Sequence, residues 1–190
     1  MIEVDLNGTI LELRNEMDEL FLDELEELII IFKQTNLTGM EKYIEAFNYL
    51  GLEEVIDVID FDGLNDLIIA YDEYEMPTEF IKSFDISGFN YTAYDEDEFI
   101  LKGKDMAMIE KIIHKKNKNT ETKDKFLAEI LAVIFKRDDL TKNEHTDPAH
   151  IQYKADLIRK NIKANVAIPY LALVSDKINR QLIKRQAKLD

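Results

Sequence analysis

The feature that most constrains the fold is a pair of short hairpin signals, each followed by helical patterns. Residues 2–13 alternate apolar and polar side chains around an Asn-Gly pair at residues 7–8. Asn-Gly favours a type I′ turn, because both central positions of that turn need positive φ. Residues 84–94 repeat the pattern around a Ser-Gly pair at residues 87–88. The chain therefore combines small antiparallel hairpins with helices.

Helical spacing fills the segment between the two hairpins. Apolar residues recur three and four apart over residues 20–32, which predicts a first helix. Thr38 and Glu41 form a predicted capping box at the start of a second helix, and Gly51 is expected to end it. Shorter helices are expected in two further places, residues 52–59 and 63–73.

After the second hairpin the chain becomes more helical. An apolar helix is expected through Met106 and Ile113, followed by a polar, exposed connector over residues 115–123. Residues 126–135 are apolar nearly all round, and this pattern predicts a buried helix.

The last part of the chain contains two more helical patterns. Asp147 is a candidate N-cap before Pro148, the residue type favoured at the first helical position. A final stretch runs from Ala164 onward, and Pro169 is expected to kink it or to restart it.

These patterns predict an α+β fold that is predominantly α-helical. Each hairpin is followed by an acidic stretch and by helices in the same order, which indicates an imperfect internal duplication of one hairpin-plus-helices unit. Two unrelated hairpins in a small α+β protein would give the same order, and this alternative stays open. The predicted domains are an acidic hairpin-plus-helices unit over residues 1–80 and a hairpin followed by a basic helical bundle over residues 81–190.

Charge is divided unequally along the chain. Residues 1–100 contain 27 Asp and Glu against 4 Lys and Arg, a sum of −23, whereas residues 101–190 contain 12 against 20, a sum of +8. Blocks of opposite sign are typical of a protein that docks in a defined orientation. The candidate partner-binding residues are six from the basic helices and four from an acidic run: Arg159, Lys160, Lys163, Arg180, Lys184, Lys188, Asp95, Glu96, Asp97 and Glu98.

No pattern in the sequence identifies a reaction. The chain has no cysteine, which excludes disulfides, thiolate zinc sites and a cysteine nucleophile. Its six glycines are isolated, so no glycine-rich phosphate loop is formed. Two imidazoles and two carboxylates are close enough in sequence to suggest a divalent-metal site: Glu144, His145, Asp147 and His150. However, helix capping already explains Asp147. We therefore expect no catalytic residue, no cofactor and no metal, and the protein is expected not to be an enzyme.

The charge also bears on nucleic acid and membrane as partners. A net charge of −15 repels a polyanion, and the aromatic residues do not interleave with the basic ones as stacking platforms do. Nucleic acid is therefore not an expected partner. The acidic first half is compatible with the opposite role, an inhibitor that imitates nucleic acid and blocks a host nucleic-acid-binding protein. The apolar run at residues 28–32 is too short to cross a bilayer, so a soluble protein without a membrane partner is expected.

Three stretches of the later chain carry a resemblance to a known class of proteins. They are residues 86–91 (ISGFNY), 126–131 (FLAEIL) and 167–173 (AIPYLAL). Their order is a Gly-turn hairpin, a buried helix, a Lys/Arg-bearing helix and a terminal helix opened by small residues and a proline. Over residues 80–180 this order resembles small bacteriophage tail or baseplate proteins, particularly tail assembly chaperones.

The resemblance implies a non-enzymatic protein that meets other virion proteins during assembly or stays in the particle. The expected function is therefore protein–protein interaction, as an assembly or structural component of a bacteriophage tail or baseplate. The acidic N-terminal surface and the basic C-terminal surface are expected to engage different partners, or the opposite half of a neighbouring copy. The expected location is the host cytoplasm during assembly or the virion, without secretion.

Overall fold

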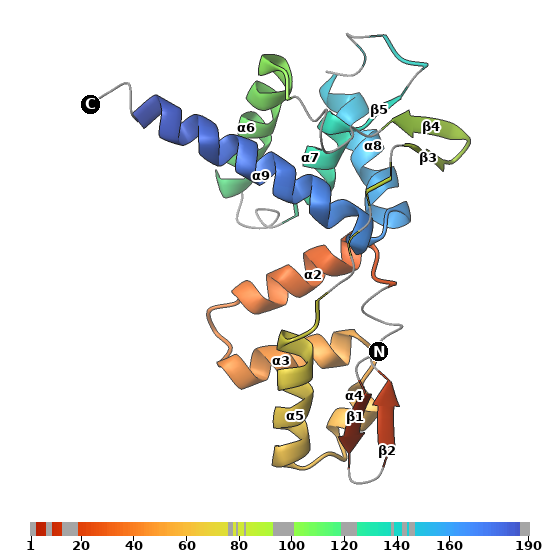
Figure 1. Cartoon of the computed structure of the whole chain (residues 1–190), viewed down its shortest axis with the longest axis vertical. Helices are drawn as coiled ribbons and strands as arrows, with labels where there is room; N and C mark the ends of the chain where they lie inside the picture. Colours follow the sequence, from red (N-terminus) through yellow and green to blue (C-terminus); the bar gives the residue numbers. More distant parts are fainter. Residues whose placement is uncertain are drawn as a thin grey trace. The chain divides into compact units, whose positions relative to one another are not determined.

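The computed structural model of the chain divides into two compact units. Unit 1 consists of Met1–Leu20 and Glu24–Pro77, and unit 2 consists of Phe21–Asp23 and Thr78–Asp190. Figure 1 labels the elements of both units. The structure describes residues 3–6, 9–12, 19–75, 78, 80–81, 83–92, 101–118, 125–137, 139–141, 144 and 147–186.

The two units differ from the predicted domains in two respects, because Phe21–Asp23 belong with the second unit and the main part of that unit begins at Thr78 instead of residue 81. The backbone N–H of Leu22 donates to the carbonyl of Ile162 at 2.9 Å. Phe21 forms an isolated antiparallel bridge with Lys163. A three-residue stretch near the N-terminus is thus hydrogen-bonded to a segment that lies far along the chain.

Unit 1 begins with the first predicted hairpin, which the structure confirms. β1 (Glu3–Leu6) and β2 (Thr9–Glu12) pair antiparallel, with Leu6 opposite Thr9. This register leaves two residues for the turn, the loop length that Asn-Gly favours. Residues 7–8 themselves lie outside the described residues.

Four helices of unit 1 follow, at the positions that the helical spacing predicted. They are α2 (Leu22–Lys33, whose first two residues belong to unit 2), α3 (Gly39–Tyr49), α4 (Glu53–Ile56) and α5 (Phe61–Asp72). The predicted capping box opens α3, since the hydroxyl of Thr38 accepts from the N–H of Glu41 and the Glu41 carboxylate accepts from the N–H of Thr38. Gly51 follows α3 at φ +82°, a left-handed conformation that glycine adopts without strain.

The core of unit 1 lies between α3 and α5. Phe47, Leu52 and Leu67 are buried there, and β1 lies against α5. Four aromatic rings from α2, α3 and α5 pack with centroids 5.2–6.1 Å apart: Phe32, Tyr43, Phe47 and Tyr71. The Phe32–Tyr43, Tyr43–Tyr71 and Phe47–Tyr71 contacts are edge-to-face, an arrangement that adds to the free energy gained by burying the rings.

Unit 2 is dominated by helices and contains a small antiparallel sheet. Its described elements are β3 (Ser83–Ile86), β4 (Phe89–Thr92), α6 (Gly103–Lys118), α7 (Leu127–Ile134), β5 (Lys136–Arg137), α8 (Pro148–Asn161) and α9 (Ala164–Gln186). Over the described residues the fold is α+β and predominantly α-helical, as the sequence predicted. The internal duplication stays a prediction.

The sheet of unit 2 contains the second predicted hairpin and one strand that was not predicted. Ser87 and Gly88 have φ of 53° and 79°, the positive values that a type I′ turn requires. β5 pairs with β4, with Tyr91 opposite Arg137. The two hairpins lie in separate sheets, β1-β2 and β3-β4-β5.

The core of unit 2 is built around α7. Every residue of α7 after Leu127 is buried, as predicted from its apolar sequence. Helices α6, α8 and α9 each contact α7, and Figure 1 shows α6 and α8 on opposite sides of it. The Phe135 ring, directly after α7, packs edge-on against Phe84 and Tyr170 at 4.9 and 5.1 Å. The Tyr170 hydroxyl donates to the carbonyl of Ile81 at 2.7 Å, which ties α9 to the segment before β3.

Two sequence predictions are wrong in this unit. The connector expected from Lys115 begins as helix, because α6 continues to Lys118, and lysines in a last turn complement the helix dipole. Pro169 does not restart the final helix, since α9 runs without a break through it. Pro169 is the sixth residue of α9, so its missing N–H removes one bond, to the carbonyl of Asn165, close to the helix start.

Candidate interaction surfaces

Unit 1 carries a large excess of negative charge. It contains 20 Asp and Glu against 3 Lys and Arg, a net charge of −17, whereas unit 2 contains 19 against 21, a net charge of +2. Between Lys42 and Lys82 the chain has eleven Asp and Glu and no Lys or Arg. The field around unit 1 is therefore strongly negative, and it attracts cationic partners over about one Debye length, ~8–10 Å at physiological salt.

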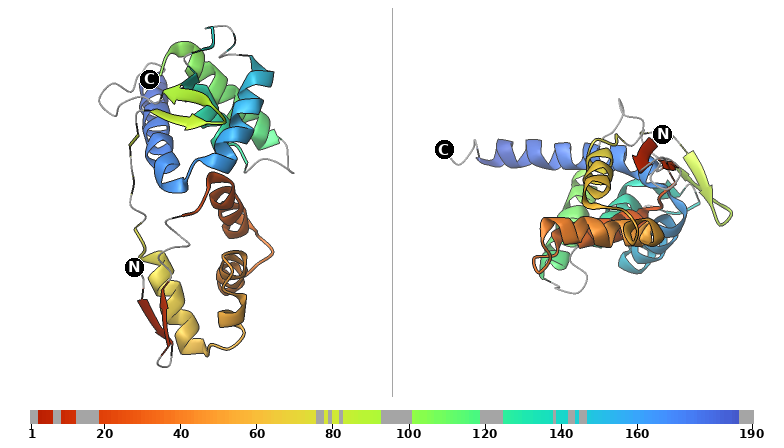
Figure 2. Two further views of the ribbon diagram at one scale, coloured as in Figure 1. Left: turned by 90° about the vertical axis from the view of Figure 1, so that its right-hand side faces the viewer. Right: turned by 90° about the horizontal axis from the view of Figure 1, so that it is seen from below.

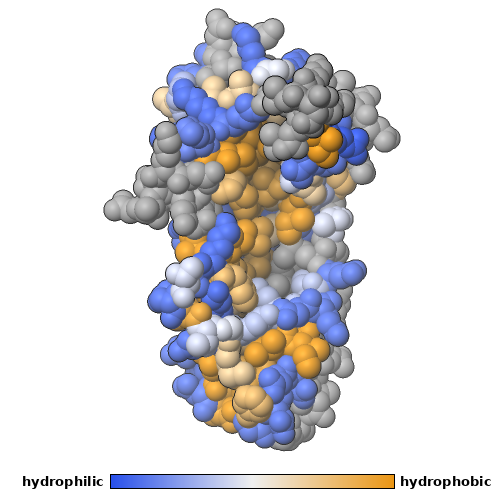
Figure 3. Space-filling model, turned by 90° about the vertical axis from the view of Figure 1, so that its left-hand side faces the viewer, coloured by the Kyte–Doolittle hydropathy of each residue, from blue (hydrophilic) through white to orange (hydrophobic). Residues whose placement is uncertain are grey.

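Large apolar side chains are exposed within this acidic unit. The exposed fractions are 83% for Val58, 64% for Phe61 and 52% for Ile69. Three exposed carboxylates belong to the same stretch of chain. We call these six residues the acidic–apolar face: Asp57, Val58, Phe61, Asp62, Asp66 and Ile69. Figure 3 shows apolar and hydrophilic residues side by side on one surface of unit 1, in the lower part of the view.

The start of α5 determines which of its residues face solvent. The Asp60 carboxylate caps α5 by accepting from the N–H of Gly63 at 2.9 Å. With the helix begun there, Leu67 is buried in the core of unit 1. Phe61 and Ile69 lie eight residues apart, so helical periodicity brings them to the same side of the helix, away from Leu67. The exposure of both rests on the register of α5 and not on a disordered loop.

A hydrogen bond fixes α5 to α3 at the other end of the helix. The Tyr43 hydroxyl lies 2.7 Å from both carboxylate oxygens of Asp72 and donates to that carboxylate. This hydrogen bond to Asp72 is the main reason that the pKa of Tyr43 is raised to about 12. The phenol stays neutral at physiological pH and holds the two helices together.

The basic residues of unit 2 that were predicted to bind a partner differ in exposure and in ion pairing. Lys160 and Lys163 are exposed at the junction of α8 and α9. Arg180 is exposed on α9 and donates to Asp176, one turn earlier, at 3.0 Å. For Lys184 the structure describes the helical backbone only. The remaining predicted residues lie outside the described residues: Lys188, Asp95, Glu96, Asp97 and Glu98.

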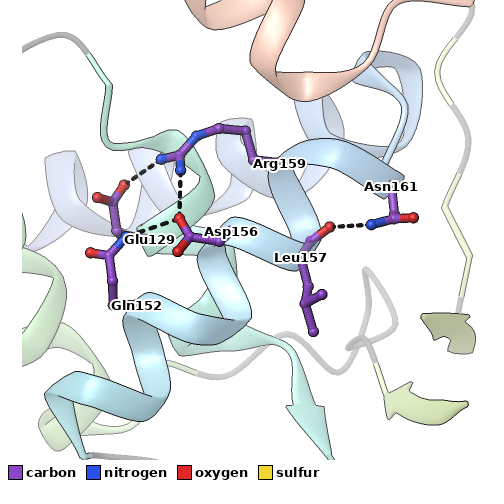
Figure 4. A network of polar contacts seen from close by, with 6 residues as sticks. All are labelled: Glu129, Gln152, Asp156, Leu157, Arg159 and Asn161. Carbon is purple, nitrogen blue, oxygen red and sulfur yellow. Dashed lines mark hydrogen bonds and ion pairs between the residues drawn. The ribbon is translucent and has the colours of Figure 1, made fainter. Parts of the chain in front are cut away.

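Arg159 is held by carboxylates of its own unit. Its guanidinium donates to Asp156 at 3.1 Å and to Glu129 of α7 at 3.4 Å (Figure 4). Gln152 also donates to Asp156, at 3.1 Å, so the network joins α7 to two turns of α8. The Glu129 side chain is nearly fully buried, and the ion pair compensates the cost of burying its charge. Arg159 thus has a structural role within unit 2.

A pocket of about 180 Å³ opens beside this network, between α6, α7 and α8. Its described lining residues are apolar except for two lysines, a carboxylate and an amide: Met108, Lys111, Ile112, Lys115, Glu129, Pro148, Ile151 and Gln152. None of these eight residues supplies a hydroxyl, thiol or imidazole group. The described lining therefore contains no Ser–His or Cys–His pair of the kind found in many hydrolytic sites.

Lys154 of α8 is fully buried, which the sequence patterns did not single out. Its ammonium group donates to the carbonyl of Phe135 at 3.3 Å. The pKa of Lys154 is lowered to about 7, mainly by burial and also by the neighbouring charges of Lys136 and Arg137, while Asp105 opposes the shift. The signal was present in the sequence, because Ile151, Ala155 and Ile158 place residue 154 within the buried stripe of α8.

The described part of the chain shows no metal site and no membrane span. Among these residues, no group of three His, Asp or Glu side chains lies close enough to hold a metal ion. Asp147 caps α8 as predicted, accepting from the N–H of Ala149 at 3.2 Å, and His145 lies outside the described residues. Within the same ranges, no helix has both the length and the apolar character needed to cross a bilayer.

Comparison with protein-family models, with curated proteins and with solved structures finds no match to this chain.

Proposed function

We propose that this protein is a non-enzymatic interaction protein that binds other proteins through an acidic surface on unit 1 and a basic surface on unit 2. From the resemblance of residues 80–180, we place this role in the assembly or structure of a bacteriophage tail or baseplate. The location proposed with it is the host cytoplasm during assembly, or the virion.

The observation that carries the proposal is the coincidence of charge with structural division. Unit 1 has a net charge of −17 and unit 2 of +2, so the two units present different electrostatic surfaces on one chain. Solubility needs no such separation, since a surface of mixed charges provides it. Complementary charge increases the rate of association and selects the orientation of docking. An adaptor that contacts two partners, or successive copies of itself, makes use of both surfaces.

The proposal is tested by co-expressing the full chain with each protein encoded next to its gene. We expect at least one tail or baseplate protein to co-purify at about 50 mM NaCl, and the complex to weaken strongly at about 500 mM. A variant with Asp57→Asn, Asp62→Asn and Asp66→Asn should lose binding to a basic partner. The matched control changes carboxylates of unit 2 that are exposed, Asp85→Asn and Glu110→Gln. A complex whose recovery changes neither with salt nor with either set of substitutions would contradict the proposal.

One observation favours a second candidate, an inhibitor that imitates nucleic acid. The segment between Lys42 and Lys82 carries negative charges and no Lys or Arg. In this respect it resembles a nucleic-acid backbone, whose charges are all negative. Adding double-stranded DNA to the same co-purification separates the two functions. A mimic competes with DNA for its target, so DNA should displace the chain. An assembly component binds a protein surface that has no affinity for DNA, and its complex should persist.

A further inference from the structure

We propose that the acidic–apolar face of unit 1 binds the basic C-terminal end of α9 from a second copy of this chain. This contact rests on the interaction function proposed above. It makes a second copy of the chain the partner of the acidic surface of unit 1.

The acidic–apolar face has the composition of a docking surface for a cationic helix. Phe61 and Ile69 form an exposed apolar stripe along α5, and Val58 adds to it just before the helix. Over residues 53–75 the chain has nine Asp and Glu and no Lys or Arg. An apolar stripe bordered by carboxylates pairs with a helix that carries apolar side chains among lysines and arginines.

The end of α9 is such a helix. Val174 is the last described side chain of α9 that is buried, and the described side chains beyond it are half-buried or exposed. Ile183 lies in this end with 65% of its surface exposed. Residues 175–186 contain four Lys and Arg against one Asp, a net charge of +3. Figure 1 and the right-hand view of Figure 2 both show this end of α9 extending away from the other helices of unit 2.

The two segments also agree in length. α5 has twelve residues, and the part of α9 beyond Val174, from residue 175 to Gln186, has twelve as well. At a rise of about 1.5 Å per residue, each is about 18 Å long. Two helices of this length can pack side by side over three turns, with Ile183 against the apolar stripe and the basic residues against Asp62 and Asp66.

The contact joins two different surfaces, so it is heterologous. Each copy offers one acidic–apolar face and one α9 end, and association therefore proceeds head to tail. Such contacts close into a ring or continue as a filament, depending on the rotation between neighbours. This distinguishes the proposal from a two-fold dimer, in which the same surface appears on both sides.

The first test measures the mass of the full chain by sedimentation equilibrium over a range of concentrations. We expect the average mass to rise with concentration beyond that of one chain at about 50 mM NaCl, and to fall towards it at about 500 mM. Phe61→Ser with Ile69→Ser removes the face, and Ile183→Ser with Lys184→Glu removes the α9 end. Each pair of substitutions should weaken association at least about tenfold. Tyr153→Ser, at an exposed aromatic residue of α8, is the matched control and should not.

Mixing the two variants gives the decisive result. The face variant still has an intact α9 end, and the α9 variant still has an intact face, so a one-to-one complex should form that neither variant forms alone. Circular dichroism of each variant shows whether it is folded before mixing. Wild-type chains that stay monomeric, or variants that do not complement each other, would overturn the proposal. Co-purification with a tail or baseplate protein would persist in that case, so the two proposals fail separately.

Discussion

At the scale of single residues, Lys154 is a buried side chain whose charge destabilises the fold. It is fully buried, its carbonyl partner Phe135 is uncharged, and the nearest charges include two further cations, Lys136 and Arg137. Removing an ammonium group from water costs several kcal/mol unless it is paired or neutralised. The lowered pKa of Lys154, about 7, shows that folding favours the neutral amine. An apolar side chain of similar length fits this position without that cost.

Lys154→Met should therefore stabilise unit 2. We expect the free energy of unfolding at pH 7 to rise by about 2–4 kcal/mol, less than the full cost of the charge because the Phe135 carbonyl loses its donor. Chemical denaturation measures the change. Lys160→Met on the same helix is the control, since Lys160 is exposed and should change stability little. A destabilised Lys154→Met protein would show that the ammonium group is better paired than its contacts indicate.

The same lysine predicts the direction of a pH effect. The pKa of Lys154 is about 7 in the folded chain and 10.5 in its ordinary state. Between these values the unfolded chain holds a proton that the folded chain has released, so the contribution of Lys154 to stability rises as pH increases from about 7 to 10.5. Below pH 7 both states are protonated and the full cost remains. Denaturation at pH 7 and pH 9 should show this rise in the wild type and not in Lys154→Met.

At the scale of elements, the two hairpins have two-residue turns of different sequence. Ser87 has a φ of 53°, in the left-handed region that a serine adopts only with strain, whereas the first hairpin has Asn at the corresponding place. Asparagine tolerates this region better, because its short amide bonds to the local backbone. The second hairpin thus has a suboptimal residue at one turn position.

Ser87→Asn should stabilise the hairpin of β3 and β4. We expect a gain of about 0.5 kcal/mol in the free energy of unfolding, from reduced strain at positive φ. Thermal unfolding followed by circular dichroism measures it. Ser83→Asn, within β3 and away from the turn, is the comparison and should give no gain, because asparagine is disfavoured in strands. Equal effects at both positions would mean that the turn conformation carries no strain.

Sequence patterns were sufficient for the elements that depend on local signals. The capping box at Thr38, the buried α7 and the cap at Asp147 follow from side chains within a few residues of one another. β5 could not be predicted, because Lys136 and Arg137 have no strand pattern and become a strand only by pairing with β4. The continuity of α9 was also missed, since the cost of Pro169 depends on how few bonds precede it.

At the scale of the whole molecule, the two units should respond differently to salt. A net charge of −17 destabilises the compact form of unit 1 through repulsion among its carboxylates, while unit 2, at +2, has little net repulsion. Salt screens this repulsion. Raising NaCl from about 50 mM to about 500 mM should therefore stabilise unit 1 more than unit 2.

Hydrogen exchange read by mass spectrometry tests this difference in one sample. Peptides from α3 and α5 should gain protection as salt increases, and peptides from α7 and α8 should change little. The acidic variant with Asp57, Asp62 and Asp66 changed to Asn should show a smaller response in α5. An equal gain in both units would indicate a general effect of salt, unrelated to the charge of unit 1.

The candidate surfaces could be predicted from the sequence only in part. Charge blocks can be read from the sequence, but the exposure of each side chain depends on packing. The sequence predicts Arg159 as a surface cation, whereas in the structure its guanidinium donates to Glu129 and Asp156. Phe61 and Ile69 look like core residues by type. Their exposure follows from the position at which Asp60 starts α5. It could not be predicted from the residue types alone.

The bridge between Phe21 and Lys163 has a consequence for the order of events during synthesis. Leu22 leaves the ribosome 140 residues before Ile162, the residue whose carbonyl it binds. Unit 1 can acquire its core while the rest of the chain is still being translated, because domains generally fold as they emerge. The hydrogen bond at the first turn of α2 forms only after Ile162 has been translated. Any nascent-chain binding partner of residues 21–23 therefore has the whole of this interval in which to act.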